Sequence, residues 1–178
     1  QYLDLSNFNS KEAIDMNKMF SGCNNLISIN LSNFSSKNVK NLSGMFQGCK
    51  ALTELNLNDF DVSQTDTMES MFSGSMVLKS LDLSSFVTTS LTNMKNMFLG
   101  CRKLTSINLP KFDTSKVTTM ENTFSTCNDL KYLNIQSFRT TSVRTFEGMF
   151  EDCYNLTSMN LSQFFTYYST NMHNMFRN

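Results

Sequence analysis

The sequence predicts a repeat solenoid of about seven coils, each 26 residues long. Two phenylalanine columns and one leucine column recur at this interval without any insertion. One coil of this length cannot bury its own apolar residues, whereas stacking in register places like residues on like residues. The columns are Phe20, Phe46, Phe72, Phe98, Phe124, Phe150 and Phe176; Phe8, Phe34, Phe60, Phe86, Phe112, Phe138 and Phe164; and Leu26, Leu52, Leu78, Leu104, Leu130 and Leu156.

Each coil is predicted to contain a short β-strand with one buried face. In the second coil, Ile29 and Leu31 alternate with the polar residues Ser28, Asn30 and Ser32. Alternation with a period of two is typical of a half-buried strand. We therefore expect parallel strands from successive coils to lie side by side on one face of the solenoid.

The other face is predicted to carry short helices or turns. Met94, Met97 and Phe98 are spaced at i, i+3 and i+4, and Gly100 follows as a helix stop. Val117 belongs to another apolar column, where we expect an extended segment. Each coil is therefore predicted to run from strand to bend, to return segment, and to a helix of one or two turns.

The domain organisation expected from these repeats is a single solenoid. Both ends of the chain fall within the repeat, and an uncapped solenoid exposes an apolar cross-section, so we expect a fragment of a longer array. The expected repeats are residues 1–26, 27–52, 53–78, 79–104, 105–130, 131–156 and 157–178.

Composition argues against several classes of function. Fifteen basic residues balance fifteen acidic ones, which gives no basic field for nucleic acid. One histidine, His173, and no C-x-x-C pair leave no catalytic triad and no zinc site of the usual spacing. No apolar run approaches the roughly 18 residues that a membrane helix needs. We expect a non-enzymatic protein without cofactor or metal, and no membrane insertion within this segment.

The five cysteines share one column of the repeat. Successive side chains in such a ladder point the same way rather than toward each other, which disfavours disulfides between neighbouring coils. Serine replaces cysteine in the third coil, so a small side chain suffices there. We expect a column of buried thiols, formed by Cys23, Cys49, Cys101, Cys127 and Cys153, with Ser75 among them.

The strings L-x-x-L-x-L at Leu78–Leu83 and M-x-x-M-F-x-G-C at Met94–Cys101 resemble BspA-type leucine-rich repeats. The resemblance covers the whole chain. It implies a cell-surface or secreted protein with an adhesive role and no catalytic activity. The sequence departs from the repeat pattern at a few positions, where we expect looser coils: Thr65, Ser75, Thr123, Thr126 and Asp152.

The strand face is the expected binding surface, because solenoids use such faces to contact partners. An outward column of Asp and Asn forms either a solvating amide ladder or part of a partner site, and it includes Asn108 and Asn134. The column two residues earlier in each coil varies more. Its distinctive members, Tyr2, Glu54 and Tyr132, are the predicted contact residues.

Charge is unevenly distributed among the coils. Residues 53–78 contain five acidic and no basic residues, and the flanking repeats 27–52 and 79–104 each carry a net charge of +3. We expect ion pairs between coils that fix the stacking register, with a site for a cation or basic ligand as the alternative.

The last repeat contains three extra aromatic residues, Phe165, Tyr167 and Tyr168. They are predicted either to pack against a following coil or cap, or to form a contact patch.

Two functional hypotheses remain. The first is a recognition or adhesion module that binds protein or glycan through the solenoid face. The second is a structural building block of an extracellular assembly, through lateral or end-to-end packing with further copies. An ice-binding face is a further idea, but serine or valine replaces threonine in the first three coils. The threonines are Thr88, Thr114, Thr140 and Thr166, and the replacements are Ser10, Ser36 and Val62.

Stacking of the phenylalanine columns can be tested with Phe98→Ala. Because stacking of the columns would place this ring in a packed core, the substitution should lower the free energy of unfolding by about 3–5 kcal/mol, measured by urea denaturation. A nearly neutral effect would contradict the stacked-column model.

Overall fold

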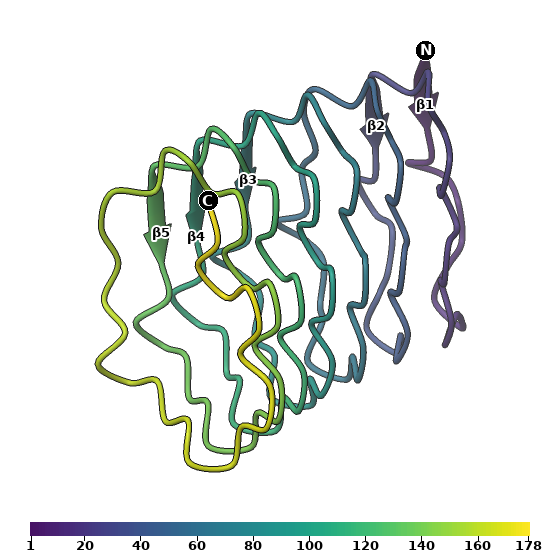
Figure 1. Ribbon diagram of the computed structural model, residues 1–178. Helices are drawn as coiled ribbons and strands as arrows, with labels where there is room; N and C mark the ends of the chain where they lie inside the picture. The colour runs from purple at the N-terminus through teal and green to yellow at the C-terminus, as the bar shows by residue number, and fades with distance from the viewer.

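The computed structural model describes residues 1–178 and shows a right-to-left stack of similar coils from the N-terminus to the C-terminus (Figure 1). Five short parallel strands lie on one side of the stack. Their pairing is offset by one repeat, as in Tyr2 opposite Ser28, which confirms the predicted solenoid. The strands are β1 (Tyr2–Asp4), β2 (Ser28–Asn30), β3 (Ser80–Asp82), β4 (Ser106–Asn108) and β5 (Tyr132–Asn134).

The predicted continuous sheet is interrupted. One sheet contains β1 and β2, and a second contains β3, β4 and β5. The third coil lies between them, and its residues 54–56 form no strand although they occupy the strand position of the repeat. The seventh coil also lacks a strand at residues 158–160.

A second backbone ladder crosses all seven coils without interruption. It consists of single-residue parallel bridges at 26-residue intervals, beginning with Asp15 opposite Asn41 and ending with Thr145 opposite Asn171. The coils therefore remain in register through the third repeat, where the strand ladder is absent.

Of the predicted short helices or turns, the structure contains only turns, and no helix forms in those segments. The Met97 N–H donates to the Met94 carbonyl at 3.1 Å, within the coil. The next N–H, that of Phe98, instead donates to Thr123 of the following coil at 2.9 Å. An α-helix would direct these donors to its own carbonyls four residues earlier. Repeated turns return side chains to one face at nearly the same spacing, which explains the misleading pattern.

The turns require two residues per coil with left-handed backbone. In the fourth coil these are Asn96 (φ 58°) and Gly100 (φ 73°). Thr126 (φ 56°) and Asp152 (φ 57°) occupy the glycine position in the fifth and sixth coils. Both still donate their N–H to the following coil at 2.7 Å, so these departures do not loosen the turns as predicted. They retain the conformation at a steric cost of roughly 1–2 kcal/mol each.

The core is one cluster of 46 buried residues that runs through the stack. The Phe98 and Phe124 rings, for example, stack with centroids 5.5 Å apart and planes 4° apart. Three of the four threonines in the proposed ice-binding column, Thr88, Thr114 and Thr140, are also interior, whereas Thr166 of the last coil is exposed. Thr88 is fully buried and donates its hydroxyl to the Asp113 carbonyl at 3.0 Å. This placement rules out the threonine column as an ice-binding face.

We expect Thr126→Gly to raise the free energy of unfolding by about 0.5–1 kcal/mol, measured by urea denaturation. Glycine removes the Cβ clash at positive φ, and the added freedom of the unfolded chain offsets part of the gain. Thr126→Ala is the matched control, because it shortens the side chain but keeps a Cβ. Equal effects of the two substitutions would show that backbone strain is not the cause.

Candidate binding face

The outward residues of the strand face divide into two groups. Tyr2 is 64% exposed and Tyr132 is 73% exposed, as expected for contact residues. They lie five coils apart, or roughly 24 Å at the usual spacing of parallel strands. Glu54 lies near Tyr2, whereas Asn108 and Asn134 lie near Tyr132. The predicted residues therefore form two separate sites rather than one.

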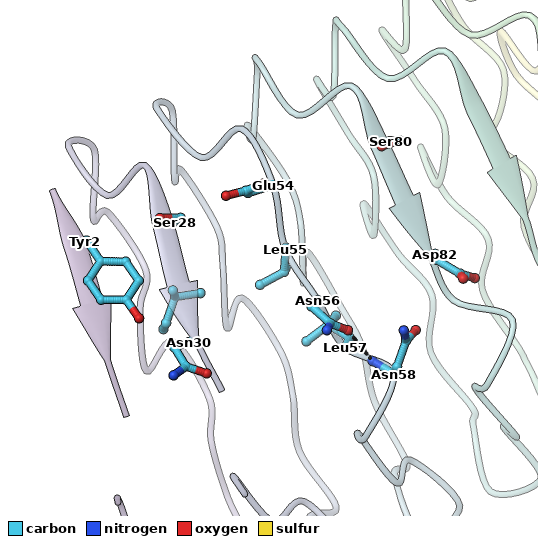
Figure 2. Close-up of a pocket in the computed structure, with 11 residues that line it drawn as sticks. Tyr2, Ser28, Asn30, Glu54, Leu55, Asn56, Leu57, Asn58, Ser80 and Asp82 are labelled. Carbon is cyan, nitrogen blue, oxygen red and sulfur yellow. Dashed lines mark hydrogen bonds between the residues drawn. The ribbon is translucent and has the colours of Figure 1, made fainter. Parts of the chain in front are cut away.

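The first site is a hollow of about 450 Å³ over the first four coils (Figure 2). Tyr2, Glu54 and Asp82 contribute its aromatic and charged side chains. Leu55 and Leu57, both buried, line it between β2 and β3. The sequence predicted Tyr2 and Glu54 as contact residues. Asp82 joins them in the lining of the hollow only because its coil stacks beside that of Glu54.

The second site is a smaller hollow of about 360 Å³ between β4 and β5. Tyr132, Asn108 and Asn134 line it together with Lys131 and Ser158. Lys131 was not predicted, because the strand alternation gave no sign that its side chain borders the face.

The Asp and Asn column mainly terminates the strands. The Asp82 carboxylate accepts the Ser84 N–H at 2.9 Å, and the corresponding residue does the same in most coils. This is an Asx turn, in which the side chain replaces a backbone acceptor. The Ser84 N–H, with a smaller contribution from its hydroxyl, lowers the pKa of Asp82 below its ordinary value. Asp82 is consequently charged at neutral pH.

Pro110 changes this arrangement in one coil, because proline has no N–H to donate. The Asn108 amide oxygen instead accepts the Asn134 side-chain amide at 2.8 Å. The Asn30 side-chain amide likewise donates a hydrogen bond to the Asp4 carboxylate at 3.1 Å. The predicted amide ladder thus exists between these two pairs of coils and is otherwise replaced by Asx turns.

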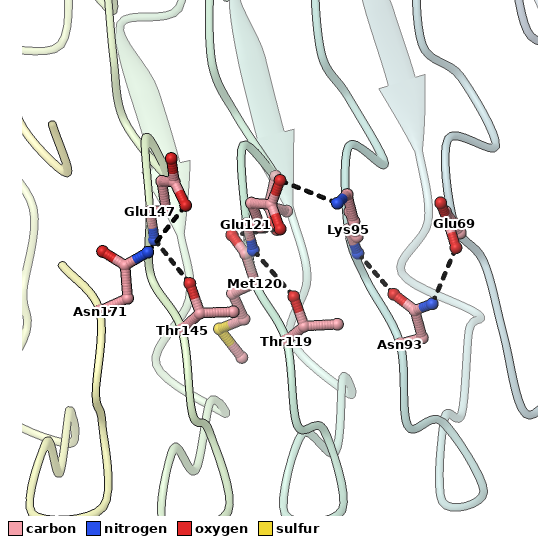
Figure 3. Close-up of polar contacts among 10 residues, drawn as sticks. Glu69, Asn93, Lys95, Thr119, Met120, Glu121, Thr145, Glu147 and Asn171 are labelled. Carbon is pink, nitrogen blue, oxygen red and sulfur yellow. Dashed lines mark hydrogen bonds and ion pairs between the residues drawn. The ribbon is translucent and has the colours of Figure 1, made fainter. Parts of the chain in front are cut away.

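A polar network on the bridge ladder was missed by sequence reasoning (Figure 3). The Asn93 amide donates to Glu69 at 3.0 Å, and the Lys95 ammonium lies 2.8 Å from Glu121. The contact with Glu121 is the main cause that raises the pKa of Lys95. The available signal was a column of charged residues one repeat apart, Glu69, Lys95, Glu121 and Glu147. The contacts join adjacent coils, so we assign the network a role in stacking.

Ion pairs do not neutralise the acidic third coil. The three ion pairs of the structure are Lys95 with Glu121, Lys103 with Asp129, and Arg177 with Glu151. None includes a carboxylate from residues 53–78. The prediction that the flanking basic coils form ion pairs with this coil is therefore wrong. Hydrogen bonds from Ser63 are the main cause that lowers the pKa of Asp61, and the charge of Lys37 in the second coil adds to that effect.

The extra aromatic residues of the last coil are on the surface. Phe165, Tyr167 and Tyr168 are 51%, 88% and 55% exposed. Tyr167 and Tyr168 pack edge to face at 4.9 Å, and the Arg144 guanidinium lies 5.4 Å from the centroid of the Tyr168 ring. These residues lie beyond the strand position of their coil and do not join either hollow.

The cysteine column is buried except at its first member, Cys23. The Cys101 thiol donates to the Phe72 carbonyl at 3.1 Å, and Ser75 makes the equivalent bond to Phe46 at 3.2 Å. Burial raises the pKa of Cys49 to about 11 and that of Cys101 to about 12. The buried thiols therefore fill space, as predicted, and donate hydrogen bonds to backbone carbonyls. Serine can replace cysteine at Ser75 because its hydroxyl makes the same bond.

Thiol titration tests this arrangement. At pH 8 a thiol with a pKa near 11 is ionised in only about one molecule in a thousand, so it reacts slowly. We expect DTNB to modify Cys23 rapidly and the four buried thiols only after unfolding in urea. Cys23→Ser should abolish the rapid phase. Rapid reaction of more than one thiol in the folded protein would refute the buried column.

No helix in the structure is long and apolar enough to cross a membrane. No group of three or more His, Cys, Asp or Glu residues is arranged to hold a metal ion.

Two crystal structures of leucine-rich repeat proteins are similar to this chain. The protein from Eubacterium ventriosum has 18% sequence identity and a TM-score of 0.62, over 98% of this chain and 42% of that one. The protein from Bacteroides ovatus has 21% identity and a TM-score of 0.50, over 79% of this chain and 32% of that one. This chain spans less than half the length of either protein. The likeness confirms the resemblance to BspA-type leucine-rich repeats at the level of the fold.

No curated protein matches the sequence. A family model described as "Mycoplasma protein of unknown function, DUF285" matches it twice, over residues 1–107 and 92–178. Together the two matches cover every coil, and the chain belongs to the DUF285 family of repeat proteins.

Proposed function

We propose that this chain is a non-enzymatic recognition module, exposed at a cell surface or secreted, that binds protein or glycan through its strand face. The observation that carries the proposal is the exposed, variable column on this face. Tyr132 presents a large aromatic surface beside the amides of Asn108 and Asn134. Aromatic side chains surrounded by polar groups are enriched where proteins bind partners.

The rigidity of the scaffold supports this role. Tyr132 lies on β5, which pairs with β4, and the neighbouring Leu133 is buried. A ligand that contacts such a residue does not have to order the loop that carries it. Binding therefore costs less conformational entropy than it would at a mobile segment.

A second candidate is a building block that associates with further copies of the chain. The exposed aromatic pair Tyr167 and Tyr168 favours it, because two adjacent exposed rings provide apolar surface for contact. Self-association that increases with concentration in sedimentation velocity, and that is lost in Tyr167→Ser with Tyr168→Ser, would support this alternative.

We expect Tyr132→Ser to weaken binding by about tenfold or more, the range of an interface hot spot. The assay is capture of defined targets by the labelled chain on arrays of purified extracellular proteins and glycans, followed by titration of each captured target. Serine occurs at the equivalent Ser106 and Ser158, so the fold should tolerate it.

Tyr154→Asn is the matched control, since Tyr154 is 62% exposed but lies outside both hollows. Asn128 occupies its position in the preceding coil. An equal loss with both variants, or no loss with Tyr132→Ser, would contradict recognition through the strand face.

A further inference from the structure

The hollow over the first four coils coincides with unpaired backbone. In the third coil, the N–H groups of residues 54–57 and the carbonyls of residues 53–56 form no hydrogen bond within the chain. The Thr53 N–H still donates to the Ile27 carbonyl at 3.1 Å, but the Thr53 carbonyl accepts no N–H, whereas the equivalent Lys79 carbonyl accepts the Thr105 N–H at 3.1 Å. The gap between β2 and β3 thus leaves donors and acceptors available to water or to a ligand.

The same hollow has a one-sided charge. Glu54 and Asp82 contribute two carboxylates to its lining, and no Lys or Arg lines it. Neither carboxylate belongs to an ion pair. Glu54 lies on the third coil with its side chain toward β2, and Asp82 lies on β3 with its side chain directed away from Glu54 (Figure 2). An extended ligand that crosses both coils would therefore meet negative charge at two separate places.

The remaining lining suits a ligand with an apolar part. Ile29, Leu55 and Leu57 contribute apolar surface, and the exposed Tyr2 ring lies at the edge. A lysine or arginine side chain combines a hydrocarbon stem with a cationic end, and arginine also stacks on aromatic rings.

We propose that this hollow binds an extended, basic peptide segment of a partner protein. One Lys or Arg side chain of the segment lies against the Glu54 carboxylate and another lies against the Asp82 carboxylate. The peptide backbone offers both donors and acceptors to the unpaired groups of residues 53–57. This assignment rests on the proposed recognition function and specifies the ligand class of one of the two hollows.

A peptide fits these observations better than a neutral glycan. Sugar hydroxyls could satisfy the free backbone groups, but they would leave two carboxylates without a counter-charge. Opposite charge steers a basic segment to the site and improves its discrimination from neutral ligands. Binding to a neutral sugar in place of the peptide is therefore an outcome that would overturn the proposal.

The probe is a fluorescein-labelled octapeptide of alternating serine and arginine, titrated with the full 178-residue chain by fluorescence anisotropy. Low ionic strength, about 50 mM, limits screening of the charges. The same peptide with citrulline in place of arginine keeps the shape and removes the charge. We expect the arginine peptide to bind and the citrulline peptide to bind at least about fivefold more weakly.

The double variant Glu54→Gln with Asp82→Asn should weaken binding of the arginine peptide by about five- to tenfold. Asparagine is native at this column in four other coils that form the Asx turn, so Asp82→Asn preserves the local fold. Asp59→Asn with Asp61→Asn is the matched control, because it removes two charges from the same coil outside the hollow. The control should change the affinity by less than about twofold.

Three results would overturn the proposal: no binding of the arginine peptide, equal binding of the citrulline peptide, or an equal loss in the control variant. Amide NMR signals of residues 54–57 provide an independent check, since they should shift when the arginine peptide binds. Absence of those shifts alongside shifts elsewhere would also overturn it. If the arginine peptide fails while array targets still depend on Tyr132, the recognition function stands and only this ligand assignment falls.

Discussion

The hydrogen bonds between the turn segments of successive coils hold the rest of the structure in place. Alternate N–H groups, such as those of Asn96 and Phe98, donate to the following coil at 2.8–2.9 Å. Such bonds can repeat through the stack only if every coil has the same length and the same backbone path. The constant 26-residue interval and the left-handed backbone at Thr126 and Asp152 are consequences of this requirement. A local steric cost is tolerated because a different path would leave donors of two coils unpaired.

Register also decides how side chains are distributed between the core and the surface. Residues of an inward column lie above one another in successive coils. Like apolar groups pack well in this arrangement, as the rings of Phe98 and Phe124 do, and the column of Cys101 and Cys127 is likewise buried. Outward columns have no such constraint, so Tyr132 can replace Ser106 without disturbing the stack. Recognition surfaces on this scaffold can therefore vary while the fold is retained. The acidic third coil is compatible with the fold for the same reason, since four of its five carboxylates are exposed and the fifth, Glu69, accepts a hydrogen bond from Asn93.

The candidate sites could be predicted only in part. Exposure of Tyr2, Glu54 and Tyr132 follows from the strand alternation, because outward positions are fixed by a period of two. Their division into two hollows depends on how many coils separate them. Glu54 and Asp82 line the same hollow only because their coils are adjacent. The free backbone around Leu55 follows from a sheet interruption that no residue pattern predicted. Ion pairing of the acidic third coil was mispredicted because the net charge of a coil does not specify which side chains come into contact.

By itself the sequence determined the repeat length, the buried columns and the outward strand positions. Each depends on a regular spacing that stacking preserves. Because the buried positions hold apolar residues, this spacing can be recognised in the sequence. Only the tertiary structure decided that Met94, Met97 and Phe98 lie on turns rather than on a helix, and that the sheet opens at the third coil. In both cases the deciding factor is the partner of each backbone N–H. In the turns that partner lies about 25 residues away in the next coil, and for the N–H groups of residues 54–57 it is absent; local sequence patterns carry no information about either.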